Sequence, residues 1–266
     1  MSRAPAVPAA SPIPLLPLSS GDDNEKSTRP HPKPNFSTPK LCLKVTDLTH
    51  DGARIFFKTT NPVAVLSDAV RTVLQTLYNS SEGQKTIPGT RSVTLILRSM
   101  DGVAYTQGSD IDDDHKEIHF SLDYIANHAS DTSKRQQDEI AGVLVHEMVH
   151  AWQWNALGTA PGGLIEGIAD FVRLRAALSP PHWKKEAGGD WDAGYQHTAY
   201  FLEWMEGKFG DGCVMRINET LRTKKYEEEC FWKGLFGQTV ANLWMEYSKE
   251  LEATQEPFDK LNATKV

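Results

Sequence analysis

The chain has 266 residues, a length typical of one large domain or two small ones. Its formal net charge of -7 argues against a general electrostatic binder of nucleic acids. No stretch approaches the roughly 20 consecutive apolar residues that cross a membrane, so we expect neither nucleic acid nor membrane as a partner.

Residues 1–40 contain nine of the 15 prolines and are otherwise rich in polar and charged residues. Proline interrupts helices and sheet ladders, so this segment is predicted to be a disordered tail. Its apolar part, residues 12–18, is broken by three prolines and does not match the continuous apolar stretch of a signal peptide. The three cysteines include no CxxC pair, which fits a reducing compartment. We therefore expect an intracellular protein, with secretion as the alternative.

The folded domain is predicted to span residues 41–252, followed by a flexible tail at 253–266. Its first half combines alternating or β-branched segments, which are typical of strands, with one segment of helical spacing. The expected strands are residues 41–47, 54–59 (as a continuation or partner of the first), 91–98 and 117–122, and the expected helix is 62–79.

An acidic loop separates the last two predicted strands and carries Asp110, Asp112, Asp113 and Asp114. Such a loop can bind calcium, but this one lacks the glycine and the final glutamate of an EF-hand loop. We therefore interpret it as a solvated turn.

The second half of the chain is predicted to be mainly helical. Helical spacing recurs in residues 135–155, 163–178, 191–209, 213–224 and 237–252. All seven tryptophans lie at or beyond Trp152, so we expect the aromatic core in this half. Strands followed by helices predict an α+β fold, with a small N-terminal β-sheet and one helix before the helical half.

The most informative motif is His-Glu-x-x-His at residues 146–150, inside the first of these helices. On a helix, His146 and His150 lie one turn apart on one face, where both imidazoles can bind the same zinc ion. Glu147 lies roughly 60° around the helix from His150. It can therefore act on a water at the metal without being a ligand.

A catalytic zinc site needs a third protein ligand. Residues 156–163 form a turn-rich loop, and the next predicted helix carries Glu166 and Asp170 one turn apart. A helix hairpin would present Glu166 as the third ligand and Asp170 to the free ring N–H of a histidine. The alternative is a solvated acidic face, but both acids lie in an apolar run, where unpaired carboxylates are costly.

These segments resemble the plant basic secretory protein family. The similarity is strongest at residues 146–155 and 160–170, continues at 191–202 and 237–244, and spans residues 41–250 in all. It implies a zincin-like fold and a zinc metallopeptidase of the Glu-zincin type, with a site plan similar to that of thermolysin. By this resemblance His146, His150 and Glu166 are the zinc ligands and Glu147 is the catalytic base.

The same resemblance suggests how an oxyanion and a substrate are held. The similar segment places a tyrosine at Tyr195, and a phenol can donate a hydrogen bond to an oxyanion. His197 is the second candidate, and the alternative makes either one a core residue of the 191–209 helix. By analogy with zincins, we expect the strand at 117–122 to be the sheet edge that binds an extended peptide.

The sequence therefore predicts a zinc-dependent metallopeptidase acting on peptide or protein substrates. One alternative is a hydrolase of non-peptide amides or esters, and another is a zinc-containing binding or defence-type protein with weak or no peptidase activity. The presence of Glu147 disfavours the second alternative. Family members are secreted and often basic, whereas this chain is acidic, so the resemblance does not extend to location or physiological role.

Overall fold

The structure is a computed structural model that describes residues 36, 38–110, 112–128 and 132–263, with side chains as far as residue 254. All of these residues belong to one unit, which spans residues 34–266. The predicted tail at residues 1–40 lies almost entirely outside the described residues. In the described part, no helix combines the length and the apolar character that crossing a membrane requires.

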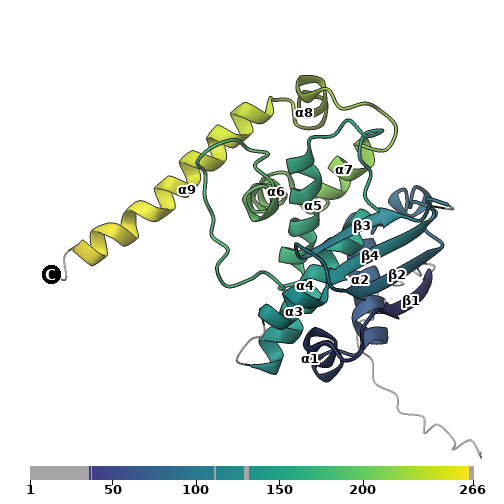
Figure 1. Cartoon of the computed structure of the whole chain (residues 1–266). Coiled ribbons are helices and arrows are strands. Elements are labelled where there is room, and N and C mark those ends of the chain that lie inside the picture. Colours follow the sequence, from purple (N-terminus) through teal and green to yellow (C-terminus); the bar gives the residue numbers. More distant parts are fainter. Residues whose placement is uncertain (1–35, 37, 111, 129–131, 264–266) are drawn as a thin grey trace, which may run out of the picture. The chain divides into compact units, whose positions relative to one another are not determined.

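Four strands form a mixed sheet in the order β1-β2-β4-β3 (Figure 1). The strand β2 pairs in parallel with β1 and β4, whereas β3 and β4 are antiparallel. The three strands predicted at 41–47, 91–98 and 117–122 are present with shifted ends. The observed strands are β1 (Lys40–Val45), β2 (Ser92–Arg98), β3 (Ala104–Gly108) and β4 (His115–Ser121).

All other regular elements of the described residues are helices, and the α+β prediction is confirmed. The helices α2 and α4 pack together and cover one face of the sheet (Figure 1). The helices are α1 (Asp51–Thr59), α2 (Pro62–Leu77), α3 (Leu122–Asn127), α4 (Ser133–His150), α5 (Gly162–Arg175), α6 (Tyr195–Phe209), α7 (Cys213–Thr220), α8 (Glu228–Phe236) and α9 (Val240–Ala263), with a short 3-10 helix η1 (Gly83–Lys85).

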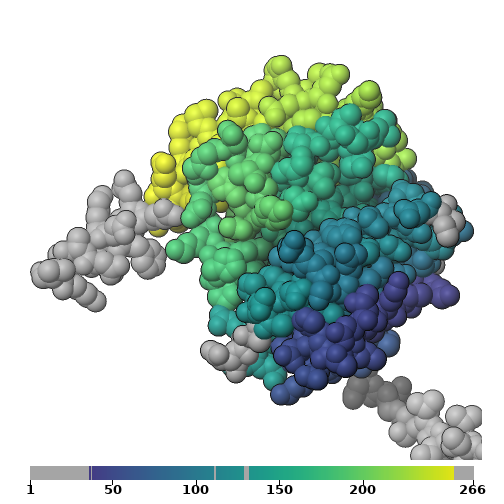
Figure 2. Space-filling view, viewed as in Figure 1, coloured from purple at the N-terminus to yellow at the C-terminus, as the bar shows by residue number. Residues whose placement is uncertain are grey.

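The two halves of the fold adjoin along a long boundary on the face seen in Figure 2, where purple to blue residues meet green to yellow ones. Beyond this boundary, the core of the helical half is aromatic, as predicted. The rings of Trp191 and Trp232 meet at 5.2 Å, and Phe201 contacts both. Trp232 is fully buried, so this cluster anchors α8 to the start of α6.

The predicted strand at 54–59 is wrong, because these residues lie in α1. The sequence Arg-Ile-Phe-Phe-Lys-Thr suits a strand by composition, but local signals favour a helix. The His50 side chain accepts a hydrogen bond from the Gly52 N–H at 3.0 Å, and Asp51 lies in the first turn. The buried residues Ala53 and Phe56 then lie three positions apart, as one helix face requires.

The prediction that strand 117–122 is a sheet edge is also wrong. Those residues form β4, which is paired on both sides, and the edge is the strand β3, which the sequence did not predict. The N–H of Ser121 donates to the carbonyl of Val103, and that of Ser109 donates to the carbonyl of His115. Since pairing alternates along an antiparallel ladder, the main-chain groups of Ala104 and Thr106 point away from β4.

Other boundaries also differ from the predictions. The motif helix α4 ends at His150 instead of residue 155, and the short helices α3 and α8 were not predicted. The last helix, α9, runs to Ala263, past the predicted end of the domain at residue 252. The flexibility of residues 253–266 stays a prediction.

The acidic loop closes the hairpin between β3 and β4, and two basic side chains form ion pairs with three of its aspartates. Arg91 contacts both Asp112 and Asp114, and the Lys116 ammonium lies 2.9 Å from Asp113. Among the described residues, this loop contributes nothing to a group of potential metal ligands. These ion pairs support the interpretation as a solvated turn.

Candidate metal centre and active site

The motif residues occupy the last turns of α4, between the sheet edge and α5. The helix begins with a cap in which the Thr132 hydroxyl accepts from the N–H of Arg135. Its apolar residues, among them Leu144, Met148 and Val149, are fully buried. This packing fixes the rotation of the helix and turns the opposite stripe toward a cavity of about 740 Å³.

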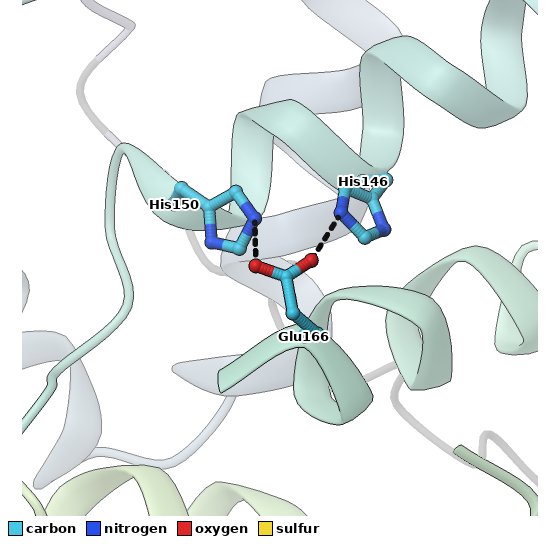
Figure 3. A group of neighbouring side chains, drawn as sticks. All are labelled: His146, His150 and Glu166. Atoms are coloured by element: carbon cyan, nitrogen blue, oxygen red, sulfur yellow. Dashed lines mark hydrogen bonds and ion pairs between the residues drawn. The ribbon is translucent and has the colours of Figure 1, made fainter. Parts of the chain in front are cut away.

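Three side chains converge at this stripe. Glu166 rises from α5 toward His146 and His150 on α4, and one carboxylate oxygen faces each imidazole (Figure 3). The distances are 3.1 Å from Oε2 to Nε2 of His146 and 3.8 Å from Oε1 to Nε2 of His150. The potential ligand atoms of the three residues all lie within 4.8 Å of one another. The helix hairpin expected from the sequence thus brings these residues together.

A second partner holds each histidine by its other ring nitrogen. The Asp170 carboxylate lies 2.7 Å from Nδ1 of His146, and the Gln153 side-chain oxygen lies 3.0 Å from Nδ1 of His150. The Gln153 amide nitrogen in turn donates to the carbonyl of Ile165 on α5. These acceptors favour the tautomers with the proton on Nδ1, which leaves both Nε2 atoms available to a metal.

Gln153 was not predicted as a partner of the site. Gln153 follows His150 by three positions, a spacing at which helical side chains meet. The sequence therefore did contain an indication of this contact. That indication was weak because α4 ends at His150, and only the turn after the helix brings the amide back to the ring.

Burial and the neighbouring carboxylates shift the pKa values of these groups. Burial lowers the pKa of His146, but hydrogen bonds with Asp170 and Glu166 outweigh it and raise the pKa to about 9. The pKa of His150 is lowered, by burial and by the charge of His146. A hydrogen bond from His146 lowers the pKa of Glu166. Without a metal, His146 therefore holds a proton that it shares with Glu166 in a hydrogen bond, and a metal ion must displace this proton from Nε2 in order to bind.

The donor set fits a divalent metal such as zinc. Two imidazole nitrogens and one carboxylate oxygen form the combination found at catalytic zinc sites of the His₂Glu type. Asp170 is only 3% exposed, and its carboxylate pairs with His146, as expected for a partner of a metal ligand. Among the described residues, this is the one group of such side chains close enough to hold a metal.

Glu147 lies beside the three potential ligands and lines the same cavity. Its side chain is almost buried, with 6% exposed. The hydroxyl of Thr106 on β3 lies 2.7 Å from Oε2 of Glu147 and 2.9 Å from its main-chain oxygen. Thr106 was not predicted, because no local pattern in the sequence relates it to a residue 41 positions away.

The structure brings Tyr195 to the cavity but not His197. The Tyr195 ring lies nearly parallel to that of His146, with centroids 6.2 Å apart, and its side chain is half-exposed. The charge of Glu166, followed by burial, raises the pKa of the Tyr195 phenol. In contrast, His197 packs against Trp244 with centroids 4.9 Å apart and does not line the cavity.

Two glycines allow Tyr195 to reach this position. A Cβ atom at Gly163 would lie 1.6 Å from the main-chain oxygen of Asp192, so only glycine permits this contact between α5 and the loop before α6. Gly194 has a φ of 88°, a conformation that favours glycine. The loop therefore runs close along the first turn of α5 and starts α6 beside Glu166.

Comparison with known proteins identifies the family of the chain. No curated protein sequence and no solved structure matches the chain significantly. A family model described as peptidase of plants and bacteria matches residues 38–247, which include β1, the motif helix, α5 and Tyr195. The matched range covers most of the chain, so the protein belongs to this peptidase family, and the resemblance to basic secretory proteins is confirmed.

Proposed function

We propose that the protein is a zinc-dependent metallopeptidase in which His146, His150 and Glu166 hold the metal and Glu147 is the general base. The observation that carries this proposal is the convergence of the three potential ligands beside a carboxylate that is not one of them. A structural zinc site is closed by four protein ligands, whereas this group opens on a large cavity.

His146, His150 and Glu166 would hold the zinc ion, which would supply polarisation of the scissile carbonyl and a water molecule of lowered pKa. The protein contributes the orientation of the ligands. Asp170 and Gln153 accept from the Nδ1 positions of the two histidines and so keep each ring in one tautomer. Hydrogen bonds with Asp170 and Glu166 outweigh burial and raise the pKa of His146, whereas burial lowers that of His150.

Glu147 takes the proton from the attacking water and passes it to the amine of the leaving group. Its Oε2 atom is held by Thr106, which leaves Oε1 as the acceptor for the water. Tyr195 donates a hydrogen bond to the oxyanion that forms as the water attacks. A phenol is protonated at neutral pH, and the pKa of Tyr195 is shifted further upward, so the donor proton is present.

An extended peptide binds along the free edge of β3. The main-chain groups of Ala104 and Thr106 point away from β4, and both residues line the cavity. A substrate strand can pair with them by adding to the sheet, which places its peptide bonds alongside Glu147. This unpaired edge favours a peptide over a small amide or ester as the substrate.

The test combines metal analysis with a cleavage screen on the purified full chain. We expect close to one zinc per chain, hydrolysis within a diverse peptide library, loss of hydrolysis with a chelator and its return when zinc is added. Hydrolysis of small esters or amides with no peptide cleavage would support the non-peptide hydrolase instead. Bound zinc without any hydrolysis would support the binding protein.

A further inference from the structure

Thr106 contacts Glu147 twice, through a single hydroxyl group. Its Oγ1 atom lies 2.7 Å from Oε2 of the carboxylate and 2.9 Å from the main-chain oxygen of the same residue. Thr106 lies on β3 and its side chain points to the face covered by α4, where its partner across the ladder, Ile118, is fully buried. The contact is therefore set by the sheet and the helix together.

The main-chain contact meets a need created by the end of α4. In a regular helix, the carbonyl of Glu147 would accept from the N–H of Ala151, four residues later. Here that N–H instead bonds to the carbonyl of Met148, at 3.2 Å, because the helix tightens in its last turn. The Thr106 hydroxyl thus lies within hydrogen-bond distance of a main-chain acceptor at the helix end as well as of the carboxylate, and the two oxygens share its single proton.

A threonine hydroxyl has one proton to donate and two lone pairs, and it rotates to suit its neighbours. When Glu147 is a carboxylate, the hydroxyl donates to Oε2. When Glu147 has taken up a proton on Oε1, its Oε2 atom is the carbonyl oxygen of the acid and can still accept from the hydroxyl. Both arrangements use the same atoms at the same distances, so the carboxyl group is held in either state.

We propose that Thr106 is a positioning residue for the general base. Its hydroxyl holds Oε2 of Glu147 throughout the reaction, and the proton moves from water to Oε1 and on to the leaving amine. The hydroxyl proton of Thr106 stays on Oγ1 and remains directed at Oε2. This inference rests on the proposed peptidase function and adds a residue to it.

The position of Thr106 links the base to the substrate. Its main-chain N–H and carbonyl are at the free edge of β3, where an extended peptide pairs, while its side chain holds the base. One residue thus sets the distance between the peptide bond and Glu147. An error of about 1 Å in such a distance can cost roughly a hundredfold in rate.

The experiment compares two replacements of similar size, Thr106→Val and Thr106→Ser. Valine keeps the shape and removes the hydroxyl, whereas serine keeps the hydroxyl and removes a methyl group. On a peptide cleaved by the wild type, Thr106→Val should lower kcat about 10- to 100-fold with KM within about twofold. Thr106→Ser should stay within about fourfold of wild type, since only one methyl group is lost. If the valine variant does not fold, Thr106→Ala serves as the second hydroxyl-free form.

A double substitution separates positioning from general damage. In a Glu147→Gln background, Thr106→Val should lower the remaining rate by less than about twofold, because groups that act as a unit have non-additive effects. A structural role would instead lower the rate by the same factor in both backgrounds.

A measurement independent of activity completes the test. The ¹³C resonance of the Glu147 side-chain carboxyl, identified by its absence in Glu147→Gln, should move in Thr106→Val and not in Thr106→Ser. An unmoved resonance, or wild-type kcat in Thr106→Val, overturns the inference while leaving the peptidase proposal intact. Absence of peptide hydrolysis by the wild type overturns the proposed function, and this inference with it.

Discussion

The sequence predicted some residues of the site and missed others. His146, Glu147 and His150 could be predicted because helical spacing alone puts them on neighbouring positions of one helix. Glu166 and Asp170 followed from the next helix, since two carboxylates one turn apart within an apolar run need partners. The roles of Thr106 and Gln153 could not be predicted from the sequence, because the contacts of Thr106 depend on a strand edge and those of Gln153 on the turn after α4.

Glu147→Gln tests the general base directly. The side chain keeps its size and still accepts from Thr106, but it cannot take up a proton. We expect unchanged zinc content and melting temperature, with turnover lowered at least about 100-fold. Rates of peptide hydrolysis at matched zinc loading provide the measurement. Equal rates for variant and wild type, above a zinc-free control, would contradict the mechanism.

Glu166 and Asp170 should differ in how strongly they affect the metal. Glu166→Ala removes a ligand and should lose most of the bound zinc. Asp170→Asn keeps an acceptor for the Nδ1 proton of His146 but removes the charge, and should weaken zinc binding about 10- to 100-fold. Competition with a chelator of known affinity measures both. Wild-type affinity in Glu166→Ala would mean that the third ligand lies elsewhere.

Tyr195→Phe removes the proposed oxyanion donor and little else, because the side chain is half-exposed and the ring is kept. The turnover number should fall about 100- to 1000-fold with zinc content unchanged. Tyr200→Phe is the matched control, since Tyr200 lies on the same helix, α6, but does not line the cavity. If both variants keep wild-type turnover, Tyr195 does not stabilise the oxyanion.

At the scale of elements, the predictions succeeded where one periodicity dominates a long segment. The buried strand β2 and the helices α2, α4, α5 and α6 have such patterns. They failed for α1, whose aromatic and β-branched residues suit a strand while its cap and buried face specify a helix. The five-residue strand β3 was missed because its Ala-Tyr-Thr-Gln-Gly sequence has no apolar alternation, and pairing with β4 alone defines it.

The contact between α5 and the loop before α6 can be tested by two neighbouring glycines. Gly163→Ala would place a Cβ atom 1.6 Å from the oxygen of Asp192, so the loop must move and carry Tyr195 away from Glu166. We expect a loss of about 1–3 kcal/mol in the free energy of unfolding, with reduced turnover. Gly162→Ala meets no heavy atom within 4 Å and should be close to neutral. Thermal melts of both variants check this, and equal stabilities would contradict the tight contact.

At the scale of the whole molecule, the site lies where the two halves of the fold meet. The sheet contributes its free edge and Thr106, while the helical half contributes Glu166, Asp170 and Tyr195, and α4 runs between them. The matched family range, residues 38–247, includes all of these elements. The substrate edge was misplaced from sequence because strand order is a property of the complete sheet.

The N-terminal boundary of the domain can be defined by two shortened chains. The composition of residues 1–33 provides little apolar surface for a core, so a chain that begins at residue 34 should retain full zinc content and melt within a degree or two of the full chain. A chain that begins at Pro39 also loses Phe36, which is partly buried against the core. Burial of a partly covered aromatic ring contributes roughly 1–2 kcal/mol, so this second chain should melt about 2–8 °C lower.

Calorimetry on the full chain and the two shortened chains, all loaded with zinc, makes the comparison. Equal melting of the two shortened chains would show that Phe36 adds nothing, whereas a large drop already at residue 34 would show that the first 33 residues pack on the domain.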